Sequence, residues 1–419
     1  MRTLRLVIGL ATIATTARAQ LATPQPTEKL LVLTVNPKTG ADSAMSVALM
    51  DVARERLGSM ARYKVNVVQK AKLCEALAAS DYTCNVLLDE TQANQLARFL
   101  TVSAYTSGTL ERSGNGFNVN IRVHDIGGSG LAFLFTVPSG NPGTAASVGE
   151  TIAQRINTVI RAAEHARECV DQRTKSQFGR ALDAARKALA IEPNLPAAHI
   201  CIATVYEAQH MGVDSQLAAY QRATRGDSVN GTAWDNIAHL YQQKGDTLKA
   251  IDALTHQLAG EPQSIQLRLG IVELLRQQKQ YERGRILLDD WLAKNPGDQR
   301  VVEFRLRVCI EGELWRCELD GFVEQIKTDS AKARDSTVLK SALGAAQQLS
   351  DTQQLLFLTH TAISRFPKNK EFWKALGSAF DLKGQNDSSV WAYKQALALD
   401  PSDAGSALLI AKAIVDGTT

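Results

Sequence analysis

Residues 231–262, GTAWDNIAHLYQQKGDTLKAIDALTHQLAGEP, decide the fold of most of this chain. Large and small apolar residues recur there at helical spacing in two runs, and Gly245 separates the two runs. Residues 370–401, KEFWKALGSAFDLKGQNDSSVWAYKQALALDP, repeat the same order of residues, and Pro262 and Pro296 are 34 residues apart. This period predicts stacked helical hairpins, because one hairpin cannot bury its apolar face alone.

Both stretches resemble the tetratricopeptide repeat. The matching residues are Trp234, Ile237, Ala238, Tyr241, Gly245, Ala250, Leu254 and Pro262 in the first stretch, and Trp373, Leu376, Gly377, Phe380, Gly384, Ser389, Tyr393, Ala396 and Pro401 in the second. Small residues let the two helices approach, and the tryptophans are expected to fill the core. Weaker units keep the same phase from about residue 162, which predicts seven hairpins. The resemblance implies an all-α superhelix over residues 168–419, with residues 404–415 as a capping helix.

Residues 29–167 predict a separate α+β domain. Its strands and helices are expected in the order β-α-β-α-α-β-β-β-α, beginning with the apolar strand LLVLTV at residues 30–35. Two glycine-rich turns, SGNG at 113–116 and GGSG at 127–130, predict hairpins between the last three strands. The segments YKVNVVQ and LARFLTVSAYTSGTLERSGNGFNVNIRVHDI resemble the small α/β domain of TolB-like and CsgG-like envelope proteins.

Residues 1–19 are expected to form a signal peptide, followed by a linker at residues 20–28. Arg2 and Arg5 precede a short apolar run, and Ala17-Arg18-Ala19 has the form of a cleavage site. Its removal leaves 44 basic and 43 acidic residues, so charge gives no reason to expect a nucleic-acid partner. We expect a periplasmic or secreted protein with no transmembrane segment in the mature chain.

The cysteines are six in number, an even count that suggests disulfides in an exported chain. Six cysteines allow fifteen complete pairings, so the spacing has to select among them. Sequence proximity favours three local pairs. They are Cys74 with Cys84, Cys169 with Cys201, and Cys309 with Cys317.

No pattern in the sequence predicts a catalytic, cofactor or metal site. The histidines are scattered, and no C-x-x-C, H-E-x-x-H, phosphate-loop or dinucleotide-binding motif is present. His124 and Asp125 are neighbours on a predicted strand, so their side chains are expected on opposite faces. We therefore expect no enzyme activity and no cofactor.

A binding surface is the remaining hypothesis. In tetratricopeptide superhelices the first helix of each hairpin lines the concave groove, and the resemblance assigns groove positions here. They are Asp235, His239, Gln242, Gln266, Glu273, Arg276, Arg300, Glu303 and Arg307. This set lacks the Lys/Asn pattern that clamps a C-terminal carboxylate, so a chaperone tail is not the expected ligand.

Two functions follow from these features. The first is an exported, non-enzymatic scaffold that binds an unidentified protein or peptide through the concave groove. The alternative is an envelope-assembly or secretion accessory that docks through the α/β domain. A deep pocket lined by titratable groups would instead favour an enzyme.

Overall fold

The computed structural model describes residues 28–61, 64–114, 116–128, 130–138 and 144–418. The predicted signal peptide lies outside these residues, as does the predicted linker apart from Glu28. The chain divides into two compact units, Met1–Leu240 and Tyr241–Thr419, which are described separately.

A mixed sheet forms the centre of the first part of unit 1. Its strands follow the order β3-β1-β4-β5-β6, and β2 pairs with β4 beside β1. The antiparallel strands β4, β5 and β6 have a continuous register, with Tyr105 opposite His124 and Ile121 opposite Phe135. The bounds are β1 (Lys29–Leu31), β2 (Asn36–Pro37), β3 (Asn66–Val67), β4 (Ala104–Ser113), β5 (Gly116–Asp125) and β6 (Phe133–Pro138).

The predicted opening strand at residues 30–35 is wrong in one respect, because β1 ends at Leu31 and the next strand, β2, begins only at Asn36. Leu31 and Asn36 are five positions apart in the chain, whereas their partners on β4, Tyr105 and Thr109, are four positions apart, so one extra residue bulges from the ladder. Side chains bond the backbone groups that leave the ladder. Arg54 donates two hydrogen bonds to the Val32 carbonyl at 3.1 and 2.7 Å, and the Leu33 N–H donates to Thr106 Oγ1 at 3.0 Å.

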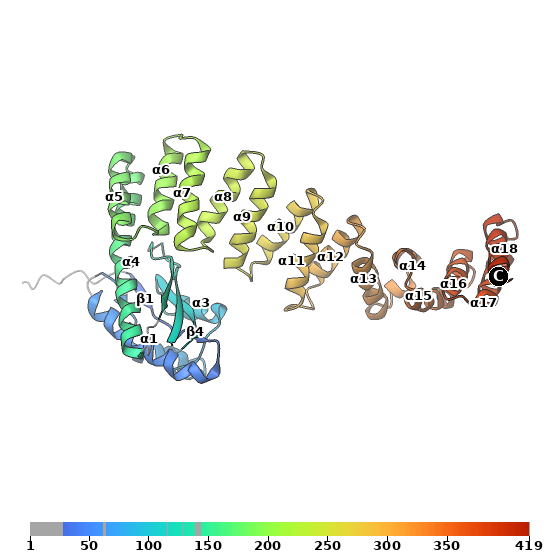
Figure 1. The fold of residues 1–419 in the computed structure, drawn as a ribbon, viewed down its shortest axis with the longest axis horizontal. Helices are drawn as coiled ribbons and strands as arrows, with labels where there is room; N and C mark the ends of the chain where they lie inside the picture. Colours follow the sequence, from blue (N-terminus) through green and yellow to red (C-terminus); the bar gives the residue numbers. More distant parts are fainter. Residues whose placement is uncertain (1–27, 62–63, 115, 129, 139–143, 419) are drawn as a thin grey trace, which may run out of the picture. The chain divides into compact units, whose positions relative to one another are not determined.

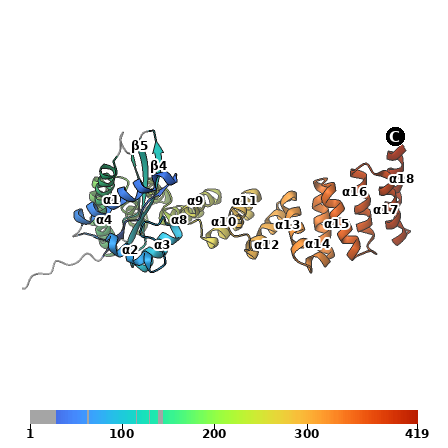
Figure 2. The ribbon, with the colours of Figure 1, turned by 90° about the horizontal axis from the view of Figure 1, so that it is seen from below.

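Helices cover both faces of the sheet (Figures 1 and 2). On one face α1 and α4 pack over residues such as Ile121 and Val123, and on the other α2 and α3 pack over Leu31 and Tyr105. A Cβ at Gly149 would lie 2.4 Å from the Leu49 carbonyl oxygen, so only glycine allows α4 to approach α1 this closely. The bounds are α1 (Ser43–Met60), α2 (Lys70–Ala78), α3 (Glu90–Phe99) and α4 (Ala145–Thr174).

A run of helices follows and confirms the predicted all-α region. Helix α4 begins beside the sheet and continues past residue 167, where the sequence places the end of the α/β domain (Figure 1). The remaining bounds in unit 1 are α5 (Phe178–Ile191), α6 (Pro196–Ala208), α7 (Val213–Gly226) and α8 (Gly231–Gln243), which extends into unit 2. Those of unit 2 are α9 (Thr247–Gly260), α10 (Ile265–Gln277), α11 (Tyr281–Leu292), α12 (Gln299–Glu311), α13 (Trp315–Thr328), α14 (Ser336–Gln348), α15 (Thr352–Arg365), α16 (Lys370–Leu382), α17 (Asn386–Leu399) and α18 (Ala404–Thr418).

A backbone feature marks every hairpin turn of this run. In the turn that follows each first helix, one residue has a positive φ, between 51° and 75°. These residues follow one another at intervals of 34 to 37 and are Ser176, His210, Gly245, Lys279, Glu313, Ser350 and Gly384. Only two are glycine, which explains why the weaker units lack a visible turn signal in the sequence.

A second feature recurs at the fourth position of several first helices. There a side-chain N–H donates to the backbone carbonyl six residues earlier. The pairs are His199 with Pro193 at 2.9 Å, Trp234 with Ser228 at 2.7 Å, Arg268 with Pro262 at 3.1 Å and Trp373 with Pro367 at 2.8 Å. The two tryptophans are therefore partly exposed, and their predicted place deep in the core is wrong, because the indole N–H has to reach a carbonyl in the preceding turn.

Candidate partner-binding groove

The first helices of successive hairpins in unit 2 form one face of the repeats, called here the first-helix face. They are α10, α12, α14 and α16, and α18 follows them. Residues at one equivalent position on these helices are Glu273, Arg307, Gly344, Ser378 and Lys412. Successive members are 34 residues apart, except that three extra residues precede Gly344. The side chains at this position are thus long on α10 and α12 and very small on α14 and α16.

The part of the face on α10 and α12 is occupied by the predicted residues themselves. Arg276 donates to Glu273 at 2.8 and 2.9 Å, and to Glu311 on α12 at 2.8 Å. Arg276 lowers the pKa of the Glu273 carboxyl, and Arg307 lies 5.8 Å from the centre of the Phe304 ring. These contacts satisfy the charges within the chain.

The other predicted groove residues lie on exposed helix surfaces. Arg300 is 3.3 Å from Asp298, which holds it near the start of α12. In unit 1, Asp235 and His239 are exposed on α8. The remaining predicted groove residues lie in unit 2 and are also exposed; they are Gln242, Gln266 and Glu303. Whether any predicted groove residue binds a partner stays a prediction.

A hollow of about 490 Å³ lies further along the same face, over α14, α16 and α18. Gly344 and Ser378 leave this space because they carry so little side chain. The hollow is lined by Lys340, Leu343, Gly344, Gln347, Glu371, Phe372, Lys374, Ala375, Ser378, Tyr393 and Leu409. Its volume is within the range of sites that hold ligands. The sequence prediction stopped at Arg307 and missed it, although the paired small residues 34 apart are visible in the sequence.

The wall and rim of the hollow are ordered by local contacts. The Tyr393 hydroxyl donates to Asp381 at 2.6 Å, and burial raises the pKa of this phenol. Lys374 lies 3.7 Å from Glu371 and 3.5 Å from Asp403, so its charge is balanced. Lys340 is exposed on the opposite rim. The hollow thus combines an apolar floor with polar and charged groups at its edge, as binding sites for protein partners do.

The three predicted cysteine pairs are confirmed as pairs at disulfide distance. The Cα atoms are 4.5 Å apart for Cys74–Cys84, 6.4 Å for Cys169–Cys201 and 5.8 Å for Cys309–Cys317. The second pair joins α4 to α6, and the third joins α12 to α13 across the hairpin turn. Each pair thus constrains neighbouring segments of the fold.

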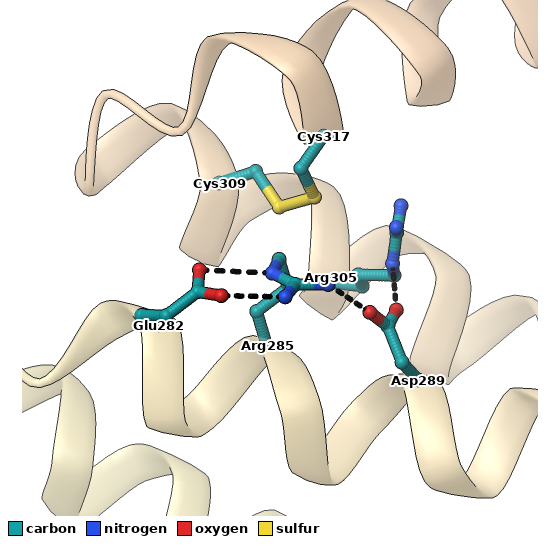
Figure 3. The surroundings of a disulfide bond; sticks show 6 residues. All are labelled: Glu282, Arg285, Asp289, Arg305, Cys309 and Cys317. Atoms are coloured by element: carbon teal, nitrogen blue, oxygen red, sulfur yellow. Dashed lines mark hydrogen bonds and ion pairs between the residues drawn. A yellow bond between two sulfur atoms is a disulfide. The ribbon is translucent and has the colours of Figure 1, made fainter.

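An ion network lies beside the Cys309–Cys317 bond (Figure 3). Arg285 on α11 bonds Glu282 at 2.9 and 2.5 Å and also pairs with Asp289. Arg305 on α12 pairs with the second oxygen of Asp289. The four charges cancel, and Arg305 links α11 to α12, so this network has a structural role.

Three polar residues, Ser107 on β4, His124 on β5 and Glu90 on α3, lie close together in unit 1. This cluster was not predicted from the sequence. Ser107 Oγ is 2.7 Å from His124 Nε2, and His124 Nδ1 is 3.7 Å from Glu90. These are the residue types of a nucleophile, a base and an acid, although 3.7 Å is longer than a hydrogen bond between the base and the acid. However, burial, assisted by the nearby Arg122 charge, lowers the pKa of His124 to about 3. A base must become a cation during acyl transfer, so this environment opposes catalysis.

The residues that the structure describes contain no group of three or more His, Cys, Asp or Glu side chains placed to hold a metal ion. Among the helices of these residues, none has the length and apolar character needed to cross a bilayer.

Comparisons with known proteins place one segment in a family. Residues 241–306 match the tetratricopeptide repeat model. No curated protein matches the sequence significantly. Similar solved structures include Naa15/Naa10 bound to HypK-THB, with 17% identity, a TM-score of 0.37, and coverage of 61% of this chain but only 39% of that one.

Two further structures are similar over most of their own length. A tetratricopeptide repeat protein from Parabacteroides merdae has 16% identity and a TM-score of 0.28, covering 60% of this chain and 98% of that one. The TPR2AB-domain:pHSP90 complex of yeast Sti1 has 14% identity and a TM-score of 0.24, covering 62% and 99%. Residues 241–306, which match the tetratricopeptide repeat model, thus lie within a longer run of helical hairpins.

Proposed function

We propose that this protein is an exported, non-enzymatic scaffold, periplasmic or secreted, that binds a protein partner through the first-helix face of its repeats. The observation that carries the proposal is the hollow over α14, α16 and α18. Core packing does not require a glycine at residue 344, because nothing lies within 4 Å of a Cβ built on Gly344. Three cysteine pairs suit an oxidising compartment.

The contacts on α10 and α12 support a division of roles along this face. Arg276 with Glu273 and Glu311 joins two neighbouring first helices and stiffens that stretch. The hollow lies beyond this stretch and has its charged groups at the rim. A partner segment is therefore expected to place an apolar side chain in the hollow and polar groups along the rim.

The test compares two glycine variants of residues 20–419 immobilised on a resin. Gly344→Trp fills the hollow, whereas Gly270→Trp places the same side chain on α10, where the Cβ position is also open. Proteins retained from an envelope extract by the unmodified chain should also be retained by Gly270→Trp and lost with Gly344→Trp. For a purified partner, Gly344→Trp should weaken binding at least about tenfold, or 1.4 kcal/mol. Equal retention by both variants would show that the partner uses another surface.

The sheet edge supports a second candidate, an assembly or secretion accessory that docks through the α/β domain. Strand β6 is the last strand of the sheet, and its Leu134 side chain is 36% exposed. An edge strand can pair with a strand from another chain. Leu134→Lys should then abolish retention while Gly344→Trp leaves it unchanged.

A further inference from the structure

A second pocket lies in unit 1, between α2 and α3 on the surface of the α/β domain. Its volume is about 180 Å³, and its walls include Leu77, Leu88, Leu96 and Phe99. Every lining side chain is uncharged, and the polar ones are hydroxyl and amide groups such as Tyr82 and Gln95. None of its lining residues belongs to the hollow over α14, α16 and α18.

The mouth of this pocket exposes an unusual amount of aromatic surface. Phe99 is 69% exposed at the end of α3, and Tyr82 is 40% exposed on the facing loop. Leu87, close to the pocket in sequence, is 39% exposed. Clustered apolar side chains around a concavity mark interaction sites, whereas singly scattered ones do not.

The wall formed by α2 and its following loop is held in place covalently. Cys74 on α2 pairs with Cys84, and the loop that this bond closes carries Tyr82. The Tyr82 hydroxyl is also 3.4 Å from Gln92 Nε2 on α3. The pocket is therefore largely formed before a ligand arrives, which lowers the entropy cost of binding.

Two side chains beneath the pocket also border a second, smaller cavity. Leu77 and Leu88 line both this pocket and a partly open cavity of about 20 Å³ beside the sheet, which is roughly the space that one water molecule needs. These two side chains therefore have some space on their inner side, into which they can shift slightly when an apolar group enters from outside.

Size and charge together define the occupant. A charged group would lose its hydration without meeting a counter-ion, because the lining holds no charge. The volume is below the roughly 300–1,000 Å³ of sites for free small molecules and suits one large side chain. We propose that this pocket takes a single aromatic or leucine-type side chain presented by a partner protein.

The test uses N-acetyl-photoleucine amide as the probe on the full mature chain. After irradiation and digestion, mass spectrometry should find the label concentrated in residues 70–82 and 88–99. N-acetyl-phenylalanine amide should compete for these sites, and N-acetyl-aspartic acid amide should not.

Two variants and two matched controls complete the test. Gln95→Glu adds a carboxylate to the lining and Phe99→Ala removes a wall, so each should reduce labelling of the pocket about fivefold or more. Gln353→Glu and Phe357→Ala change exposed residues of the same types on α15 and should leave it unchanged. Label spread over the surface, equal competition by the aspartic acid amide, or full labelling in both pocket variants would each overturn the proposal. Gly344→Trp should leave this labelling intact, so the outcome is independent of the groove.

Discussion

Gly344 and Ser378 occupy the same position on successive first helices, 34 residues apart, and together they open the hollow in unit 2. The neighbouring Gly377 has the opposite surroundings, because a Cβ there would lie 2.4 Å from the Tyr393 ring. Two glycines of similar sequence context thus serve different purposes. One leaves space at the surface, and the other lets a buried tyrosine pack against α16.

This difference predicts opposite effects of the same substitution. Gly344→Ala should raise the free energy of unfolding by up to about 1 kcal/mol, because alanine is a better helix former and meets no neighbour. Gly377→Ala should lower it by about 1–3 kcal/mol through overlap with Tyr393. Denaturant unfolding of both variants measures the two changes, and a loss of stability in Gly344→Ala would contradict the open site.

The hairpin turns give a second prediction. Lys279 has a φ of 56° at the position where Gly245 has a φ of 75°. A side chain with a Cβ costs free energy in this region, so Lys279→Gly should stabilise the protein or leave its stability unchanged. Gly245→Ala should destabilise it by about 1 kcal/mol. Melting temperatures of the two variants provide the comparison, and the reverse order would exclude a left-handed residue at these turns.

Glu318 on α13 gives a prediction that depends on pH. Only 7% of Glu318 is exposed, and burial raises the pKa of its carboxyl above the ordinary 4.5. The folded state therefore holds this proton more tightly than the unfolded state. Its stabilising contribution is full below about pH 4.5 and is lost as the pH rises through the folded pKa.

The substitution Glu318→Gln removes the charge and keeps the shape. It should raise the melting temperature at pH 7 by about 1–3 °C and have little effect near pH 3. Glu324→Gln, on an exposed position of the same helix, is the control and should change neither value. An equal gain at both pH values would point to a cause other than charge.

A buried ion pair fastens the sheet to the repeats of unit 1. Arg122 on β5 donates to Asp227 at 3.2 Å and to the Val229 carbonyl at 3.2 Å, and the Asp227 side chain is only 2% exposed. Asp227→Ala would leave Arg122 poorly compensated and should cost about 2 kcal/mol, less than a fully buried pair because Glu90 lies 3.6 Å away.

The exposed pair of Arg186 and Asp183 is the matched control. Both side chains are more than half exposed, so Asp183→Ala should cost less than about 0.5 kcal/mol. Chemical unfolding of the two alanine variants measures both costs. Similar values would mean that the Arg122 contact does not hold the sheet to the repeats.

Features with short-range causes were predictable from the sequence. The hairpins follow from apolar residues three and four positions apart, and their number follows from the 34-residue period. Cys309 and Cys317 are paired because a hairpin turn brings close neighbours in the chain together. The division of the first strand was not predictable, because it depends on Arg54 reaching the Val32 carbonyl from α1.

The candidate sites, too, could be predicted only in part from the sequence. The repeat pattern identifies the first-helix positions. It does not show that Arg276 forms ion pairs with Glu273 and Glu311. Nor does it show that the open stretch lies at Gly344 and Ser378, because this depends on which neighbouring side chains fill the face.

By itself, the sequence determined which segments are helices, which cysteines pair and how often the hairpin recurs, since local spacing sets all three. Only the tertiary structure decided where the surface is hollow, because a cavity is the space left between side chains from separate helices. It also brought Ser107, His124 and Glu90 together and set their charge environment, since burial lowers the pKa of His124 to about 3. Burial and long-range contacts depend on how elements distant in sequence pack, and no local pattern encodes them.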